Sequence, residues 1–212
     1  MSSLRLGDLA PDFSADSTQG PIRFHDRIDK GWAVLFSHPA DLTPVCTTEL
    51  GATARLKGEF DKRGVKVATL RVDALESHHR WIADIEQTQE VQLGLPIIAD
   101  PEQKAAEQHY MIHPNASEKT TVRSLFIIGP DKKVKLMIVD PASTGRNFQE
   151  ILRVTDSLQL TAKHQLATPA DRKDGEEVII LPAVSDEEAH KRYPAGFRAV
   201  KPYLRYVDQP RD

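Results

Sequence analysis

Hydrophobic and polar positions divide the first three quarters of the chain into short apolar runs that alternate with segments of helical spacing. Five runs predict strands: residues 32–36, 65–72, 95–100, 122–128 and 134–139. Four segments predict helices: residues 43–64, 75–87, a short stretch after Pro101, and 147–163. Turn residues at 129–133 make the last two strands a hairpin. The order of elements predicts an α/β fold, a mixed central sheet flanked by helices.

The pattern changes near residue 165. The remaining tail is rich in proline and charge and carries one apolar run, at residues 178–181. Domain boundaries fall where composition shifts in this way. We therefore expect a main domain of residues 1–165 and a small C-terminal domain of residues 166–212.

The composition is that of a soluble globular protein, with 40% hydrophobic and 28% charged residues. A net charge of −3 predicts no electrostatic binding to nucleic acid or to an anionic membrane. The longest apolar stretch, residues 32–36, is far shorter than the roughly 20 residues of a membrane helix. The first residues lack the apolar core of a secretory signal. These features predict a cytoplasmic protein.

The chain contains a single cysteine, Cys46. One cysteine excludes an intrachain disulfide, a paired redox motif and a multi-cysteine metal site. Any redox chemistry must therefore use one sulfur, and a partner outside the chain must restore it. We expect no metal and no cofactor.

Cys46 falls in the first turn of a predicted helix, where Thr43 is a suitable N-cap and Pro44 suits the first helical position. The start of a helix favours an anion, such as a thiolate. Thr43 can place a hydroxyl beside the sulfur, and Pro39 and Pro44 stiffen the loop. The alternative is a cysteine that serves as a small buried hydrophobe.

The segment at residues 36–49 resembles the active-site segment of peroxiredoxins, in which a proline, a threonine and a cysteine follow at fixed spacing, here Pro39, Thr43 and Cys46. Its Ser-His-Pro lead-in resembles the one-cysteine, peroxiredoxin-6-like branch. Further matches cover nearly the whole chain: residues 10–13, Trp81, 96–100, 144–148, 150–153, 160–162 and 203–206. The resemblance implies a thioredoxin-like peroxidase domain followed by a C-terminal peroxiredoxin dimerisation domain.

The resemblance also implies catalytic roles. Cys46 is the expected peroxidatic nucleophile, and Thr43 and Arg123 are expected to bind the peroxide oxygens and hold the thiolate. A guanidinium is always charged and can stabilise both a thiolate and a leaving oxygen. The alternative for Arg123 is a surface arginine on an edge strand.

Three further residues are candidate supports of the site. Arg146 matches a second family arginine, and we expect it to brace Glu49 and Arg123. Glu49 lies one helical turn after Cys46, although a solvated acid at a helix start is the alternative. His38 lies near the sulfur in the one-cysteine branch and can hydrogen-bond it or donate a proton, with a structural or merely exposed histidine as the alternative.

The expected reaction is thiol-dependent reduction of hydrogen peroxide and organic hydroperoxides, an antioxidant function. Cys46 becomes a sulfenic acid, and an external thiol or other reductant restores it. The resemblance implies at least a homodimer, and the sequence does not distinguish a dimer from a decamer. Two other classes remain open: a ring-forming protein that binds unfolded chains, and a dimer module with a retired active site.

One departure from the branch concerns a phospholipase activity credited to some members. His25 and Asp131 are present, but the serine position before Trp32 is Gly31. Glycine has no side-chain nucleophile. We therefore expect no lipase activity by that route.

Overall fold

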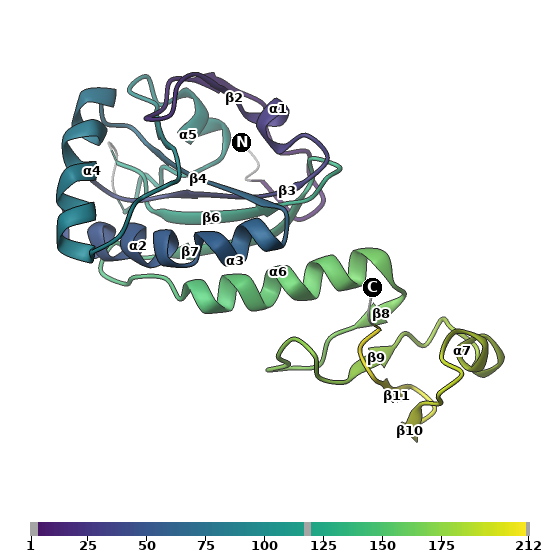
Figure 1. Ribbon diagram of the computed structural model, residues 1–212. Helices are drawn as coiled ribbons and strands as arrows, with labels where there is room; N and C mark the ends of the chain where they lie inside the picture. The colour runs from purple at the N-terminus through teal and green to yellow at the C-terminus, as the bar shows by residue number, and fades with distance from the viewer. Residues whose placement is uncertain (1–3, 117–119, 211–212) are drawn as a thin grey trace. The chain divides into compact units, whose positions relative to one another are not determined.

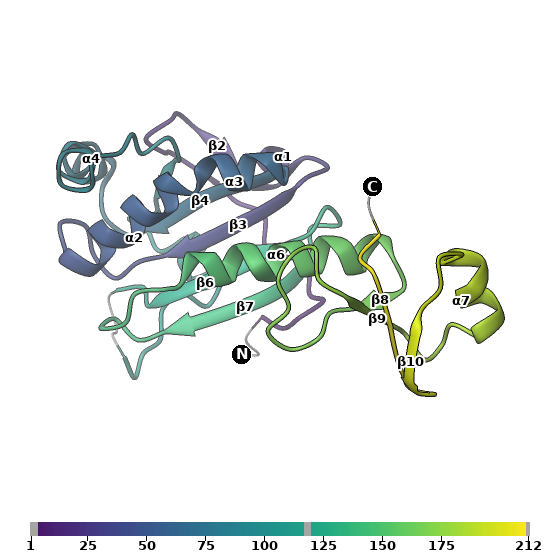
Figure 2. The same ribbon diagram turned by 60° about the horizontal axis from the view of Figure 1, so that its bottom comes forward.

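The computed structural model describes residues 4–116 and 120–210, and its chain separates into two compact units, Met1–Phe148 and Gln149–Asp212 (Figures 1 and 2). The first unit holds a five-stranded sheet in the order β5-β4-β3-β6-β7. Its strands are β3 (Trp32–Ser37), β4 (Val65–Arg71), β5 (Ile97–Ala99), β6 (Arg123–Ile128) and β7 (Val134–Asp140). β3, β4 and β5 run parallel, whereas β6 pairs antiparallel with both β3 and β7. The sheet is therefore mixed, as predicted.

Helices lie on both faces of this sheet (Figure 1). They are α1 (Phe24–Ile28), α2 (Pro44–Arg55), α3 (Lys57–Lys62), α4 (Leu75–Gln89) and α5 (Lys104–Gln108). A two-stranded sheet of β1 (Ser14–Ala15) and β2 (Ile22–Arg23) precedes α1.

The continuous helix predicted for residues 43–64 is wrong, because the chain leaves α-helical geometry at Leu56, where φ is −95° and ψ is 1°. The Leu56 N–H is shared between the carbonyls of Ala52 and Thr53, which tightens the last turn of α2. Gly58, two residues on, is a weak helix former. Two shorter helices result.

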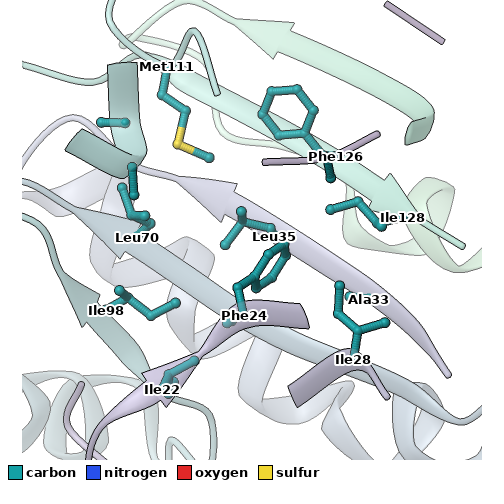
Figure 3. Close-up of a cluster of buried hydrophobic side chains, with 14 of the residues drawn as sticks. Ile22, Phe24, Ile28, Ala33, Leu35, Leu70, Ile98, Met111, Phe126 and Ile128 are labelled. Carbon is teal, nitrogen blue, oxygen red and sulfur yellow. The ribbon is translucent and has the colours of Figure 1, made fainter. Parts of the chain in front are cut away.

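Alternation along the strands supplies the core on each face of the sheet. Ala33 and Leu35 of β3 point into one cluster with Leu70 and Phe126, while Val34 and Phe36 point to the other face. Figure 3 shows that this cluster is closed by side chains from α1 and from the segment after α5, labelled Phe24, Ile28 and Met111. Burial on both faces explains why the central strands read as unbroken apolar runs.

The sheet register brings residues that are distant in the sequence together at one end of the interior strands β3 and β6. β3 pairs with β6 so that Phe36 lies opposite Leu125. The carboxyl end of β3, from which the loop at residues 38–43 leads into α2, therefore lies beside the first residue of β6, Arg123.

The C-terminal unit has its own small antiparallel sheet, in the order β10-β11-β9-β8. Its elements are α6 (Phe148–Lys163), β8 (Leu166–Ala167), β9 (Val178–Ile180), α7 (Asp186–Arg192), β10 (Arg198–Lys201) and β11 (Leu204–Val207). A separate cluster built around Val178, Ile180 and Ala189 forms its core.

The division of the chain into these units falls after Phe148, whereas the sequence pattern placed the boundary at residue 165. The difference is α6, which belongs by its contacts to the second unit. The thioredoxin-like fold with a small C-terminal domain is confirmed.

Candidate active site

Cys46 is the third residue of α2 and is completely buried. Its Sγ lies 3.4 Å from Nη1 of Arg123. The sulfur therefore sits at a helix start and against a permanent positive charge.

Arg123 is 2% exposed and begins β6, an interior strand of the sheet, so the alternative of a surface arginine on an edge strand is wrong. Its Nε and Nη2 donate to the Ala142 carbonyl at 3.1 and 2.7 Å. Nη1 donates to Oε2 of Glu49 at 2.6 Å and faces Sγ. These contacts occupy four of the five N–H groups and leave one on Nη2 for a ligand, counting partners among the described residues.

Glu49 is 3% exposed, so it is not the solvated acid of the alternative reading. Arg146 donates to it from its backbone N–H at 2.8 Å, from Nε at 2.9 Å and from Nη2 at 2.7 Å. Burial opposes ionisation of Glu49, but the hydrogen bonds and charge of Arg146, with the charge of Arg123, lower its pKa. Glu49 is therefore an ionised acceptor shared by two guanidiniums.

The guanidinium of Arg146 also lies over the Phe36 ring, 4.7 Å from its centroid, and donates from Nη1 to the Ser124 carbonyl. Arg146 contacts Glu49 directly, as expected. Among the contacts of the described residues, the Glu49 carboxylate is the acceptor that it shares with Arg123.

Thr43 occupies the N-cap position of α2 with extended backbone geometry, as predicted, but its side chain does not cap the helix. Its hydroxyl donates to the Ala40 carbonyl at 2.8 Å. Because that bond uses the only hydroxyl proton, Oγ1 is left as an acceptor. The Trp81 indole N–H supports the same helix turn by donating to Thr47.

His38 is completely buried, and both ring nitrogens have partners away from the sulfur. Nδ1 lies 2.9 Å from Oγ1 of Thr69, and Nε2 lies 3.1 Å from Oδ1 of Asp41. Oδ2 of Asp41 lies 2.5 Å from Nδ1 of His78. Burial lowers the pKa of His38 more than its hydrogen bond with Asp41 raises it.

Sequence reasoning missed Asp41, His78 and the Ala142 carbonyl. The only local signal for Asp41 is its spacing of three residues from His38. Contacts to His78 depend on how α4 packs. Every residue has a backbone carbonyl, so the sequence does not show that the Ala142 carbonyl accepts from Arg123.

The residues that match the phospholipase pattern make other contacts. The His25 ring lies 2.8 Å from the Ala10 carbonyl, and Asp131 pairs with Lys135. A Cβ atom at Gly31 would lie 3.1 Å from the Gly64 carbonyl oxygen, which is tighter than nine in ten Cβ contacts in proteins.

Comparisons with known proteins agree over the whole chain. The AhpC/TSA family matches residues 6–137, and the C-terminal domain of 1-Cys peroxiredoxin matches residues 157–196. The 1-Cys peroxiredoxin of Dictyostelium discoideum is 52% identical over 98% of this chain and 86% of its own. Peroxiredoxin-6 of Gallus gallus is 51% identical over 99% of this chain and 100% of its own.

Solved structures give the same result. The peroxiredoxin 6 of Arenicola marina, a cysteine-to-serine mutant, has a TM-score of 0.92 at 48% identity and covers 99% of this chain and 100% of its own. The yeast mitochondrial 1-Cys peroxiredoxin has a TM-score of 0.91 at 46% identity, covering 97% and 99%.

Fold and site together define a peroxiredoxin, a thiol peroxidase of antioxidant function. The C-terminal match and the single buried cysteine narrow this class. The chain belongs to the 1-Cys peroxiredoxin family. Within residues 4–116 and 120–210, none of the helices combines the length and hydrophobicity needed to cross a membrane.

Proposed function

We propose that Cys46, Thr43 and Arg123 carry out peroxide reduction, with Pro39, Glu49 and Arg146 supporting them. The observation that carries this proposal is the 3.4 Å contact between Cys46 Sγ and Arg123 Nη1, inside a buried charge network. Pro39 stiffens the loop before α2. His38 is assigned no direct contact with the sulfur, because both of its ring nitrogens are engaged elsewhere.

The geometry gives each group one task in the attack. The Cys46 thiolate attacks one oxygen of ROOH in line, and the O–O bond breaks as the S–O bond forms. Thr43 Oγ1 accepts the O–H of the attacked oxygen, and Arg123 donates its free Nη2 N–H to the leaving oxygen. The products are the Cys46 sulfenic acid and RO⁻, which takes a proton from solvent to become ROH.

An external thiol completes the cycle. A thiol R′SH condenses with the sulfenic acid, releasing water and forming a mixed disulfide, and a second R′SH releases R′SSR′ and the Cys46 thiol. The yeast relative is described as resolved through glutathione and thioredoxin systems. We propose the same two classes of reductant here.

Peroxide consumption by wild type and Cys46→Ser protein, with glutathione or thioredoxin supplied, tests the proposal. We expect the Cys46→Ser variant to show only the rate of the thiol alone. A trap for sulfenic acid should label Cys46 in the wild type after one equivalent of peroxide. Undiminished turnover by Cys46→Ser would refute a role for this sulfur.

The isosteric change Thr43→Val tests the second role. Removal of one aligned polar group costs about 100-fold in rate. We expect that loss in the rate constant for Cys46 oxidation, with recovery in Thr43→Ser. Equal rates in Thr43→Val and wild type would remove Thr43 from the mechanism.

The homodimer, the possible decamer and the cytoplasmic location stay predictions. The resemblance and the matched C-terminal domain support a dimer, and composition supports the location.

A further inference from the structure

A buried carboxylate outside the sulfur site holds the loop that carries Thr43. Asp41 lies in that loop, between β3 and α2, and its side chain is 2% exposed. Its two oxygens contact His38, at the end of β3, and His78, on α4. We call these three residues the Asp41 clamp.

The hydrogen-bond pattern makes Asp41 an ionised acceptor. Burial opposes ionisation of Asp41, but hydrogen bonds from the two rings outweigh it and hold its pKa well below the usual range. A carboxylate only accepts, so His38 Nε2 and His78 Nδ1 both carry the hydrogen they direct at it. His38 Nδ1 then accepts from the Thr69 hydroxyl.

The cost of this arrangement points to more than packing. His78 Nε2 is buried and has no hydrogen-bond partner among the described residues. A buried polar group left without a partner is destabilising. Buried ionic clusters are also weak sources of stability compared with apolar packing. The clamp is therefore poorly explained as a stabilising device.

The loop that the clamp holds is short and strained. Leu42 has φ of 55°, in the left-handed region that bulky residues rarely adopt, and its side chain is 59% exposed and anchors nothing. Asp41 supplies the anchors: besides the clamp, its N–H faces Oδ2 of Asp73 at 3.4 Å, and Arg71 holds that carboxylate at 2.6 Å.

The clamp connects to Thr43 through one peptide unit. The Thr43 hydroxyl donates to the carbonyl of Ala40, and that carbonyl belongs to the peptide bond that enters Asp41. Moving Asp41 therefore turns the carbonyl that orients Oγ1.

We propose that Asp41 is a positioning residue for peroxide reduction, because its clamped carboxylate fixes the loop that aims Thr43 Oγ1 at the substrate. This inference rests on the proposed role of Thr43. It adds a group that touches neither sulfur nor peroxide.

A double-mutant cycle tests the inference, using Asp41→Ala, Thr43→Val and the two combined. The readouts are the single-turnover rate constant for Cys46 oxidation by hydrogen peroxide and the rate of alkylation by iodoacetamide. Small misplacements of a catalytic group cost up to about 100-fold. We expect Asp41→Ala to slow peroxide reduction about 10- to 100-fold, and the double variant to be no slower than Thr43→Val.

Alkylation should be unchanged in Asp41→Ala, because it needs the thiolate but no aligned hydroxyl. Asp41→Asn should recover most of the rate, since the amide keeps the shape and can bond to both rings. The exposed Asp84→Ala on α4 is the matched control and should match wild type. His78→Leu replaces one of the two histidine partners of Asp41 with an apolar side chain. We expect it to show an intermediate loss in the rate of peroxide reduction even if Asp41→Ala does not fold.

Losses that multiply in the double variant would overturn the inference, because Asp41 would then act independently of Thr43. An equal slowing of alkylation, or no loss in either Asp41→Ala or His78→Leu, would overturn it as well. Failure of the proposed role of Thr43 is distinguished by the single variant: Thr43→Val would then oxidise Cys46 at the wild-type rate.

Discussion

The buried side chains around Cys46 carry unequal charge. Arg123 and Arg146 are both buried at the site, and Glu49 compensates only one of them. The three side chains therefore carry one net positive charge. A fixed positive charge in a buried site stabilises negative charge that develops as a peroxide bond breaks. The network thus supports the proposed role of Arg123 towards the leaving oxygen by its charge as well as by its contacts.

Replacing the shared acceptor should be costly. Glu49→Gln leaves two buried guanidiniums around a neutral amide, and breaking a buried ion pair costs about 3–5 kcal/mol. We expect a loss of that size in the free energy of unfolding, measured in urea at pH 7. The control Glu150→Gln disrupts a partly exposed pair with Arg153 and should cost less than about 1 kcal/mol. Equal losses in the two variants would contradict this account.

Another buried histidine, His109, is expected to make stability depend on pH. Burial lowers the pKa of His109 from 6.5 to about 4, against an opposing hydrogen bond to the Ala105 carbonyl. Between these values the unfolded chain binds the proton and the folded protein does not. Stability is therefore complete above pH 6.5 and falls by about 3 kcal/mol as the pH drops towards 4.

Urea unfolding across that range should show the loss in wild type and a shallower fall in His109→Leu. His79→Leu, at an exposed position on α4, is the matched control and should keep the wild-type slope. A wild-type slope in His109→Leu would assign the acid sensitivity to other groups.

At the residue scale, a local motif marks the candidates that the structure brings into contact. Arg123 contacts both Cys46 and Glu49, and Thr43 lies at the N-cap of the same helix. Asp41 was missed because its contacts with His78 span 37 residues and depend on the packing of α4. Spacing along the chain carries no information about such a pair.

At the scale of elements, long periodic segments were predicted well and short ones poorly. β3, β4, α4 and α6 begin within one residue of their predicted starts. The two- and three-residue strands of the C-terminal unit are too short for any period to show. α7 left a usable signal that was not applied: Ser185 accepts from the Glu188 N–H, in the pattern of a capping box.

Two glycines, one inside α3 and one just after its C-terminal end, give opposite predictions for the same glycine-to-alanine exchange. Gly58 lies in α3 with open space where a Cβ would be, so Gly58→Ala should stabilise the protein by about 0.5–1 kcal/mol. Gly64 has φ of 63°, so Gly64→Ala should destabilise it by about 1 kcal/mol. Urea midpoints of the two variants check this, and a shift in the same direction for both would contradict it.

At the scale of the whole molecule, every residue assigned to the site lies in the first compact unit. The role of the C-terminal unit in dimerisation is a prediction from resemblance. Sedimentation equilibrium should give a mass near 2 × 23.7 = 47.4 kDa. A mass of 23.7 kDa at micromolar concentration would refute the dimer, and a mass near ten protomers would support the decamer.

Complete burial of Cys46 has a consequence for the proposed second half of the cycle. A thiol must bring its own sulfur into line with the oxidised one. Because the sulfur is completely buried in the structure, we expect this approach to require a motion of the protein around the first turn of α2. Turnover should therefore level off as the thiol concentration rises, at a plateau that reports the rate of that motion.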